Sequence, residues 1–154
     1  LNAGIICHGV ATPTEALSTA VFHFYESLTL PSLLNIDLAD VDSIAGGIGI
    51  SFNEVGNSSE DIIGKLPKES YIAKSALLHF SCVKNVTLEE VYKITKTISA
   101  RKLAYLYPNY VAKNEKKLYK RIKLKMGLRV VDEIPERSKR PRISLTAILF
   151  GIKN

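Results

Sequence analysis

The sequence predicts an α/β (α+β) fold in which a long N-terminal helix precedes a domain of intermixed strands and helices. Three observations support this class. The chain has 154 residues, of which 46% are hydrophobic and 23% charged, the composition of an ordinary globular protein with one buried core. A helical apolar periodicity runs through residues 16–28. Beyond residue 45, apolar stretches typical of strands alternate irregularly with helical patterns.

The leading helix is expected to begin at Thr12. Thr12 and Glu15 form a capping box, and Pro13 occupies the first helical position. Pro31 then ends the helix. The apolar positions between these limits follow the spacing of a helix buried along a broad stripe; they are Ala16, Leu17, Ala20, Val21, Phe24, Tyr25 and Leu28.

The middle of the chain predicts a strand, two short helices and a second strand. Residues 46–52 form a glycine-flanked strand pattern, and residues 53–59 form a turn cluster. The apolar spacing that ends at Leu66 predicts a short helix, and residues 68–75 predict another helical turn or two. Residues 76–83 are apolar enough for a buried strand.

A second capping box, Thr87 with Glu90, predicts the start of another helix. Its apolar face continues at helical spacing as far as Ile98. Residues 103–111 are rich in Tyr, Leu and Val, so we expect a strand there, interrupted by Pro108.

The last part of the chain predicts a basic amphipathic helix followed by two strands. Residues 114–126 have apolar side chains at four-residue steps, which favours the helix. Residues 129–134 and 143–152 read as strands, joined by the basic, proline-containing loop 135–141.

Positive charge is concentrated in this last part. Residues 113–142 hold twelve Lys/Arg and four Asp/Glu, a local excess of +8, whereas the rest of the chain carries −2. Such a surface attracts an anionic membrane, an acidic partner or, less favoured because Tyr119 is its only aromatic residue, nucleic acid. The alternative is a solvated helix face followed by a basic loop. The expected basic surface comprises Lys116, Lys117, Lys120, Arg121 and Lys123.

The cysteines, the N-terminus and the apolar runs of the sequence indicate its cellular location. Cys7 and Cys82 show no metal-ligand spacing and cannot build a disulfide framework. The N-terminus has no secretory pattern, and no apolar run approaches the ~18 residues of a membrane-spanning helix. We therefore expect a cytoplasmic location.

The candidate motifs for phosphate or metal binding do not match the sequence patterns that such sites require. Gly64 and Lys65 are followed by Leu66, where a phosphate-binding loop needs Ser or Thr for magnesium. The aspartates near residue 40 do not match calcium-loop spacing, and the three histidines form no metalloprotease pattern. We expect no metal site in this chain.

The most informative polar cluster is the acidic loop, residues 33–41, which contains Asn35, Asp37 and Asp40. A helix that begins near Asp37 brings both carboxylates onto its first turn. One interpretation is purely structural, with Asp37 as the N-cap and Asp40 as a partner of the helix dipole. The other is that the pair takes part in chemistry.

A resemblance to a known family favours the second interpretation. The acidic loop, Leu-Leu-Asn-Ile-Asp-Leu-Ala-Asp-Val, resembles the L-I-N-x-D-F-A-D-V loop of the tubulin/FtsZ family, and it likewise follows a long helix and precedes a glycine-rich segment, residues 46–49. Residues 76–80 with the helix start at 85–91, and the apolar strand at 144–151, resemble further FtsZ segments in the same order.

The resemblance implies a small mixed β-sheet packed with two to three helices, as in the C-terminal domain of FtsZ. It also implies a cytoskeletal GTPase active in cell division, which polymerises in the cytoplasm. In that family GTP with Mg²⁺ is bound by the nucleotide domain of one subunit, and the acidic loop of the next subunit completes the site. By this match Asp37 and Asp40 orient the attacking water, and Asn35 positions the loop against the neighbour's nucleotide.

The resemblance also predicts how the chain is divided. Residues 1–30 correspond to the end of a nucleotide domain and the central linking helix, and residues 31–154 to the C-terminal domain with a basic insertion at about 112–142. The chain begins at Leu1 and its first fourteen residues carry no charge, which predicts a piece of a larger fold. Alone, such a piece binds neither GTP nor Mg²⁺ and is inactive. The competing hypothesis is an α+β interaction module that binds nucleic acid or an anionic membrane through residues 113–142.

Overall fold

The computed structural model describes residues 2–5, 14, 18, 21–22, 25–26, 28–29, 32–37, 39–40, 48–106, 123–134 and 140–151. The elements follow one another in the order β1 (Asn2–Ile5), β2 (Ile48–Gly56), α3 (Ser59–Lys65), α4 (Glu69–Ile72), β3 (Ser75–Val83), α5 (Leu88–Leu106), β4 (Lys123–Val131) and β5 (Ile143–Phe150). The predicted class, a mixed α/β domain, is confirmed.

The strands form one mixed sheet in the order β1-β2-β5-β3-β4. The C-terminal strand β5 lies in the middle and runs antiparallel to both β2 and β3. The outer pairs are parallel, β1 with β2 and β4 with β3. Because β5 has a strand on each side and is covered on both faces, its residues are almost all buried, which explains its predominantly apolar sequence.

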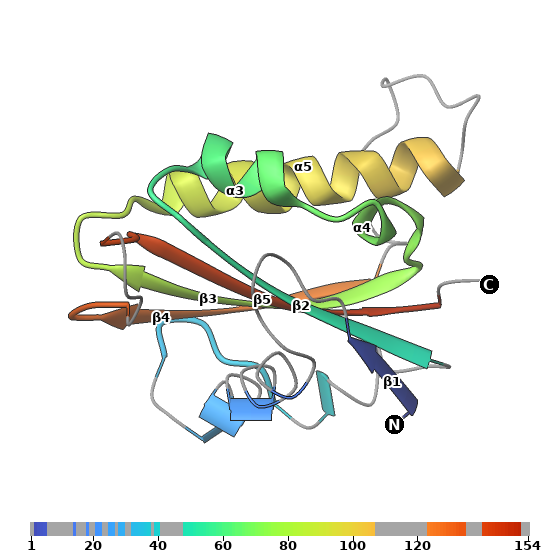
Figure 1. Cartoon of the computed structure of the whole chain (residues 1–154), viewed down its shortest axis with the longest axis horizontal. Helices are drawn as coiled ribbons and strands as arrows, with labels where there is room; N and C mark the ends of the chain where they lie inside the picture. Colours follow the sequence, from blue (N-terminus) through green and yellow to red (C-terminus); the bar gives the residue numbers. More distant parts are fainter. Residues whose placement is uncertain are drawn as a thin grey trace.

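The helices α3, α4 and α5 cover one face of the sheet (Figure 1). Between them and the strands lies the main core, in which Val91, Ile94 and Ile98 of α5 are at most 2% exposed. Successive strand residues point to opposite faces, so Leu78 belongs to this core, whereas Leu77 belongs to a smaller core on the other face. That second core connects the sheet to the N-terminal part of the chain.

The long leading helix is not confirmed as a whole. The described residues from 14 to 29 are helical, and the Thr29 hydroxyl donates to the Tyr25 carbonyl at 2.8 Å, a helical four-residue step. The intervening residues, and with them the predicted capping box at Thr12 and Glu15, lie outside the described residues. In Figure 1 the described helical residues of this segment lie on the side of the sheet opposite α5.

The strand predicted at residues 103–111 is wrong at its start. The helix α5 continues to Leu106. Ala100, Lys102 and Ala104 are strong helix formers, and together they extend the helix against the strand preference of the neighbouring tyrosines.

The basic helix predicted at residues 114–126 is also wrong at its end, because β4 begins at Lys123. Residues 114–122 lie outside the described residues. Within β4, three basic residues and Gly127 alternate with Leu124, Met126 and Leu128, which is the two-residue period of a strand. These residues form a strand because they pair with β3 along nine residues. Similarly, β2 extends to Gly56 through part of the predicted turn.

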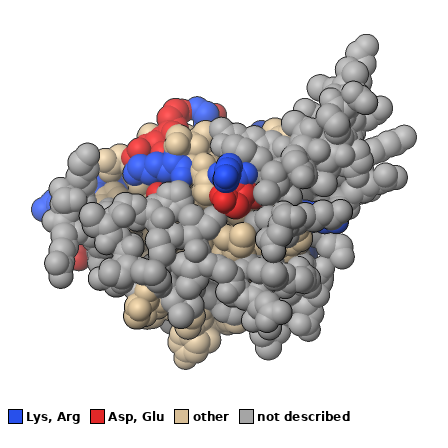
Figure 2. Space-filling model, turned by 45° about the vertical axis from the view of Figure 1, so that its right-hand side comes forward, with Lys and Arg blue, Asp and Glu red and all other residues tan. Residues whose placement is uncertain are grey.

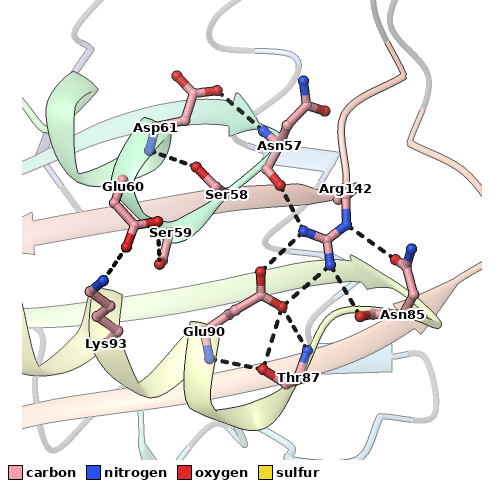
Figure 3. Close-up of polar contacts among 10 residues, drawn as sticks. All are labelled: Asn57, Ser58, Ser59, Glu60, Asp61, Asn85, Thr87, Glu90, Lys93 and Arg142. Carbon is pink, nitrogen blue, oxygen red and sulfur yellow. Dashed lines mark hydrogen bonds and ion pairs between the residues drawn. The ribbon is translucent and has the colours of Figure 1, made fainter.

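Arg142, just before β5, joins three segments that are distant in sequence (Figure 3). Its guanidinium donates to Glu90 Oε1 at 3.0 Å and to the carbonyls of Asn57 and Asn85 at 2.8 and 3.1 Å. Glu90 is itself held by the predicted capping box, since it accepts from the Thr87 N–H at 2.9 Å. Arg142 therefore ties the ends of β2 and β3 and the first turn of α5 to β5.

Replacing Arg142 with Met is expected to lower the free energy of unfolding by about 1–3 kcal/mol, because several hydrogen bonds to a charged group are lost at once. Urea denaturation followed by circular dichroism measures this difference. The control is Arg140→Met, since Arg140 is exposed two residues away. Equal stability of the two variants would contradict the role assigned to Arg142.

Candidate functional site

The acidic loop is attached to the outer edge of the sheet. Leu33 and Leu34 donate backbone hydrogen bonds to the Leu128 carbonyl at 2.9 and 3.3 Å, and the Leu128 N–H donates to the Leu34 carbonyl at 2.9 Å. This short bridge covers part of the free edge of β4, which otherwise presents unpaired backbone groups. The loop thus has a defined position relative to the sheet.

A buried side chain anchors the loop next to this bridge. Ile36 is 4% exposed and packs in the second core with Leu77 and Phe150. It lies close to Gly127 of β4, where a Cβ would approach Ile36 Cγ1 to 3.1 Å and His79 Cδ2 to 3.2 Å. The absence of a side chain at Gly127 therefore leaves the space that Ile36 occupies.

Asp37 and Asp40 form a reciprocal pair of hydrogen bonds at the start of a helical turn. The Asp40 N–H donates to Asp37 Oδ1 at 2.7 Å, and the Asp37 N–H donates to Asp40 Oδ2 at 3.2 Å. This is the geometry of a capping box, so the structural role considered for the pair in the sequence is present. It also fixes the two carboxylates next to each other.

Asp40 has a further partner on the sheet. Lys125 of β4 places its Nζ 3.1 Å from Asp40 Oδ1, with the two side chains 48% and 25% exposed. The backbone N–H of Asp37 and then the Lys125 ammonium lower the pKa of Asp40 from its ordinary value. Asp40 is therefore ionised at neutral pH and can accept hydrogen bonds but not act as an acid.

Asp37 and Asn35 face outward. Both side chains are exposed. Asp37 uses Oδ1 to bind the Asp40 N–H, and its Oδ2 has no hydrogen bond to any part of the chain that the structure describes. Each carboxylate oxygen can accept two hydrogen bonds, so this pair can still bind a water molecule or another donor from outside.

A cleft among the described residues lies apart from the acidic loop. It has a volume of about 1020 Å³ and lies between the helical residues around Phe22 and the sheet. An ion pair of 2.7 Å between Arg129 and Glu26 crosses it. Neither Asp37 nor Asp40 lines this cleft. The candidate site is therefore an exposed loop and not an enclosed pocket.

The predicted basic surface is only partly within the described structure. Lys123 begins β4, whereas Lys116, Lys117, Lys120 and Arg121 lie outside the described residues.

Three other cations of the 113–142 segment have carboxylate partners inside the chain: Lys125, Arg129 and Arg142 pair with Asp40, Glu26 and Glu90. In Figure 2, too, described Lys and Arg side chains lie beside Asp and Glu. These pairs reduce the charge available to a polyanion, which does not favour the interaction-module hypothesis.

The described residues contain neither a cluster suited to a metal ion nor a membrane-spanning helix. Nowhere in that part of the chain do three or more His, Cys, Asp or Glu residues come together in a way that could hold a metal ion. No described helix is both long and apolar enough to cross a membrane.

Sequence reasoning missed Lys125 as part of the site, counting it only as one charge of a basic segment. The signal that identifies it is the alternation of residues 123–130. Lys125 is two residues from Gly127 and therefore lies on the same face of β4. Because the preceding residues favour a helix, the sequence prediction extended that helix to residue 126 and did not use the alternation.

Comparison with known proteins relates this geometry to one fold. No family model matches the sequence. A point mutant of FtsZ from M. jannaschii superposes with a TM-score of 0.63 at 22% identity, covering 90% of this chain and 39% of that one. An empty FtsZ dimer from the same organism gives a TM-score of 0.61 at 19% identity, covering 92% and 40%.

The chain thus spans about two fifths of the length of these FtsZ structures. At these identities the likeness concerns the fold. The chain has the fold of an FtsZ/tubulin-like C-terminal domain, as the resemblance of its acidic loop and its strands predicted.

Proposed function

We propose that this chain is the C-terminal domain of an FtsZ-like cytoskeletal GTPase and supplies the acidic loop that completes the hydrolysis site of an adjacent subunit. The observation that supports the proposal is the position of Asp37 and Asp40. They lie on an exposed loop that is attached to the edge of a sheet with the FtsZ fold. A pair of carboxylates at the surface, Asp37 exposed and Asp40 partly exposed, suits a site whose other half belongs to another molecule.

The chemistry required of the loop is modest. Phosphoryl transfer depends mainly on positioning and electrostatics, so a carboxylate that orients the attacking water contributes even when it is a weak base. Asp40 is such a weak base, since its pKa is lowered. Asp37 has an oxygen that the described residues leave available for water. In the assembly Mg²⁺ would accompany the phosphates of GTP, and Asn35, an exposed residue of the same loop, would contact the nucleotide.

Self-association follows from the same proposal. The filament forms when the nucleotide domain of one subunit binds the acidic-loop face of the next, in the cytoplasm. One of the two similar FtsZ structures is a dimer, which supports self-association. The isolated 154-residue chain is then inactive, because it carries only one half of the shared site.

GTP hydrolysis by the full-length protein, measured over a range of protein concentrations, tests the proposal. Turnover per subunit is expected to be nearly absent at low concentration and to rise steeply once subunits associate, because the site is shared between two molecules. Light scattering on the same samples reports assembly. A rate per subunit that is independent of concentration, or no turnover in assembled protein, would exclude a shared hydrolysis site.

A further inference from the structure

The acidic loop is held by β4 through more than its backbone bridge. Three consecutive same-face positions of this strand are Lys125, Gly127 and Arg129. Gly127 leaves room for Ile36, and Lys125 forms the ion pair with Asp40. One strand edge therefore holds both the apolar anchor of the loop and one of its two carboxylates.

Asp37 and Lys125 restrain different parts of Asp40. The capping box determines where the backbone of Asp40 lies and holds Oδ2 at 3.2 Å from the Asp37 N–H. Lys125 holds the other oxygen, Oδ1, at 3.1 Å. Lys125 thus restrains the side-chain torsions of Asp40 from the sheet.

The pair has no evident value as a stabilising interaction. Both side chains are partly exposed, Lys125 by about half, and ion pairs exposed to this degree add little to stability. Lys84 and Asp132, whose side chains are 81% and 94% exposed, form a comparable surface pair at a distance of 3.7 Å. What distinguishes Lys125 is its partner, one of the two carboxylates assigned to the reaction.

We propose that Lys125 is a positioning residue for GTP hydrolysis, which binds Asp40 Oδ1 and holds the Asp40 carboxylate in the orientation used on the neighbouring subunit's nucleotide. This inference rests on the proposed function. It adds that β4, and not the acidic loop alone, determines the geometry of the shared site. A misplaced catalytic group reduces rate even when every group is present, and a displacement of the order of 1 Å can cost about 10²-fold.

The test compares full-length Lys125→Met, Lys125→Arg and Lys84→Met with the wild type at saturating GTP and at equal polymer mass measured by sedimentation. Lys125→Met is expected to lower turnover per assembled subunit by about 10–100-fold. Lys125→Arg keeps the cation and its donors and is expected to stay within a few-fold of the wild type. Lys84→Met, the matched loss of a lysine in a surface pair, is expected to leave turnover unchanged.

The outcomes distinguish a failure of the positioning role of Lys125 from a failure of the proposed function. Wild-type turnover in Lys125→Met, with an inactive Asp40→Asn variant beside it, would overturn the positioning role and leave the proposed function intact. An active Asp40→Asn variant would instead overturn the proposed function itself. An equal loss in Lys125→Met and Lys125→Arg would show that charge at this position does not hold Asp40. Should Lys125→Met fail to assemble, Lys125→Gln replaces it. We expect the same loss of turnover per assembled subunit, and wild-type turnover would again overturn the positioning role.

Discussion

Replacing Asp40 with Asn is expected to lower GTP turnover by the full-length protein by about 10²–10⁴-fold, the usual contribution of a positioned acid–base group. The amide keeps the shape of the side chain and an oxygen that can accept from the Asp37 N–H or from Lys125. It removes the negative charge that, in the proposed function, orients water. Asp37→Asn is expected to act in the same direction, because its exposed carboxylate is the other group available to the water.

The measurement is phosphate release at equal polymer mass, with Asp132→Asn as the matched control. Asp132 is a surface carboxylate with 94% of its side chain exposed, paired with Lys84 at a different position in the sheet. We expect wild-type turnover in this control. Retained turnover in assembled Asp40→Asn would remove Asp40 from the reaction, and the structural capping role would then be its whole function.

The same variant shows whether the loop acts on a second molecule. The 154-residue chain contains an intact acidic loop and none of the phosphate-binding motifs. Added to the full-length Asp40→Asn variant, it is expected to restore part of the turnover by binding to the exposed nucleotide end of that variant. The same chain carrying Asp40→Asn serves as the control. Restoration by both chains, or by neither, would contradict action between subunits.

The largest effect on stability is expected from Leu78→Ala, which should lower the free energy of unfolding by about 2–5 kcal/mol. Leu78 lies in β3 and is 0% exposed in the main core. Its loss removes apolar burial and leaves a cavity, because β3 is held between β5 and β4 and cannot collapse into the space.

Chemical denaturation of the 154-residue chain measures this change, and Leu88→Ala is the matched control. Leu88 loses the same atoms but is 54% exposed at the start of α5. Surface changes of this kind are usually within about 0.5 kcal/mol of zero. A loss below about 1 kcal/mol in Leu78→Ala would show that the sheet and α5 do not enclose a rigid core at this position.

Strongly local signals made much of the fold predictable. The buried strand β3, the short helices α3 and α4, and the start of α5 at the Thr87–Glu90 capping box agree with the sequence prediction. These elements were found because turn residues, caps and apolar spacing act over a few neighbouring positions. The mixed sheet agrees with the family resemblance, whose loop and strand motifs appear in the correct order along the chain.

Elements with conflicting local signals were assigned wrongly. Residues 103–106 contain both helix formers and aromatic residues, and residues 123–126 fit a helical as well as a strand period. In β4 the decision came from pairing with β3, a partner more than forty residues away in sequence. Such a partner is invisible to a pattern confined to one segment.

By itself, then, the sequence determined the class of the fold, through the order of its elements, and the capping of Asp37 with Asp40, which depends on residues close together in the chain. Only the tertiary structure decided where the acidic loop lies and what holds it. The bridge to Leu128, the space beside Gly127 and the ion pair with Lys125 all join residues about ninety positions apart. Folding of the sheet creates these contacts, because it brings the edge strand β4 to the N-terminal part of the chain.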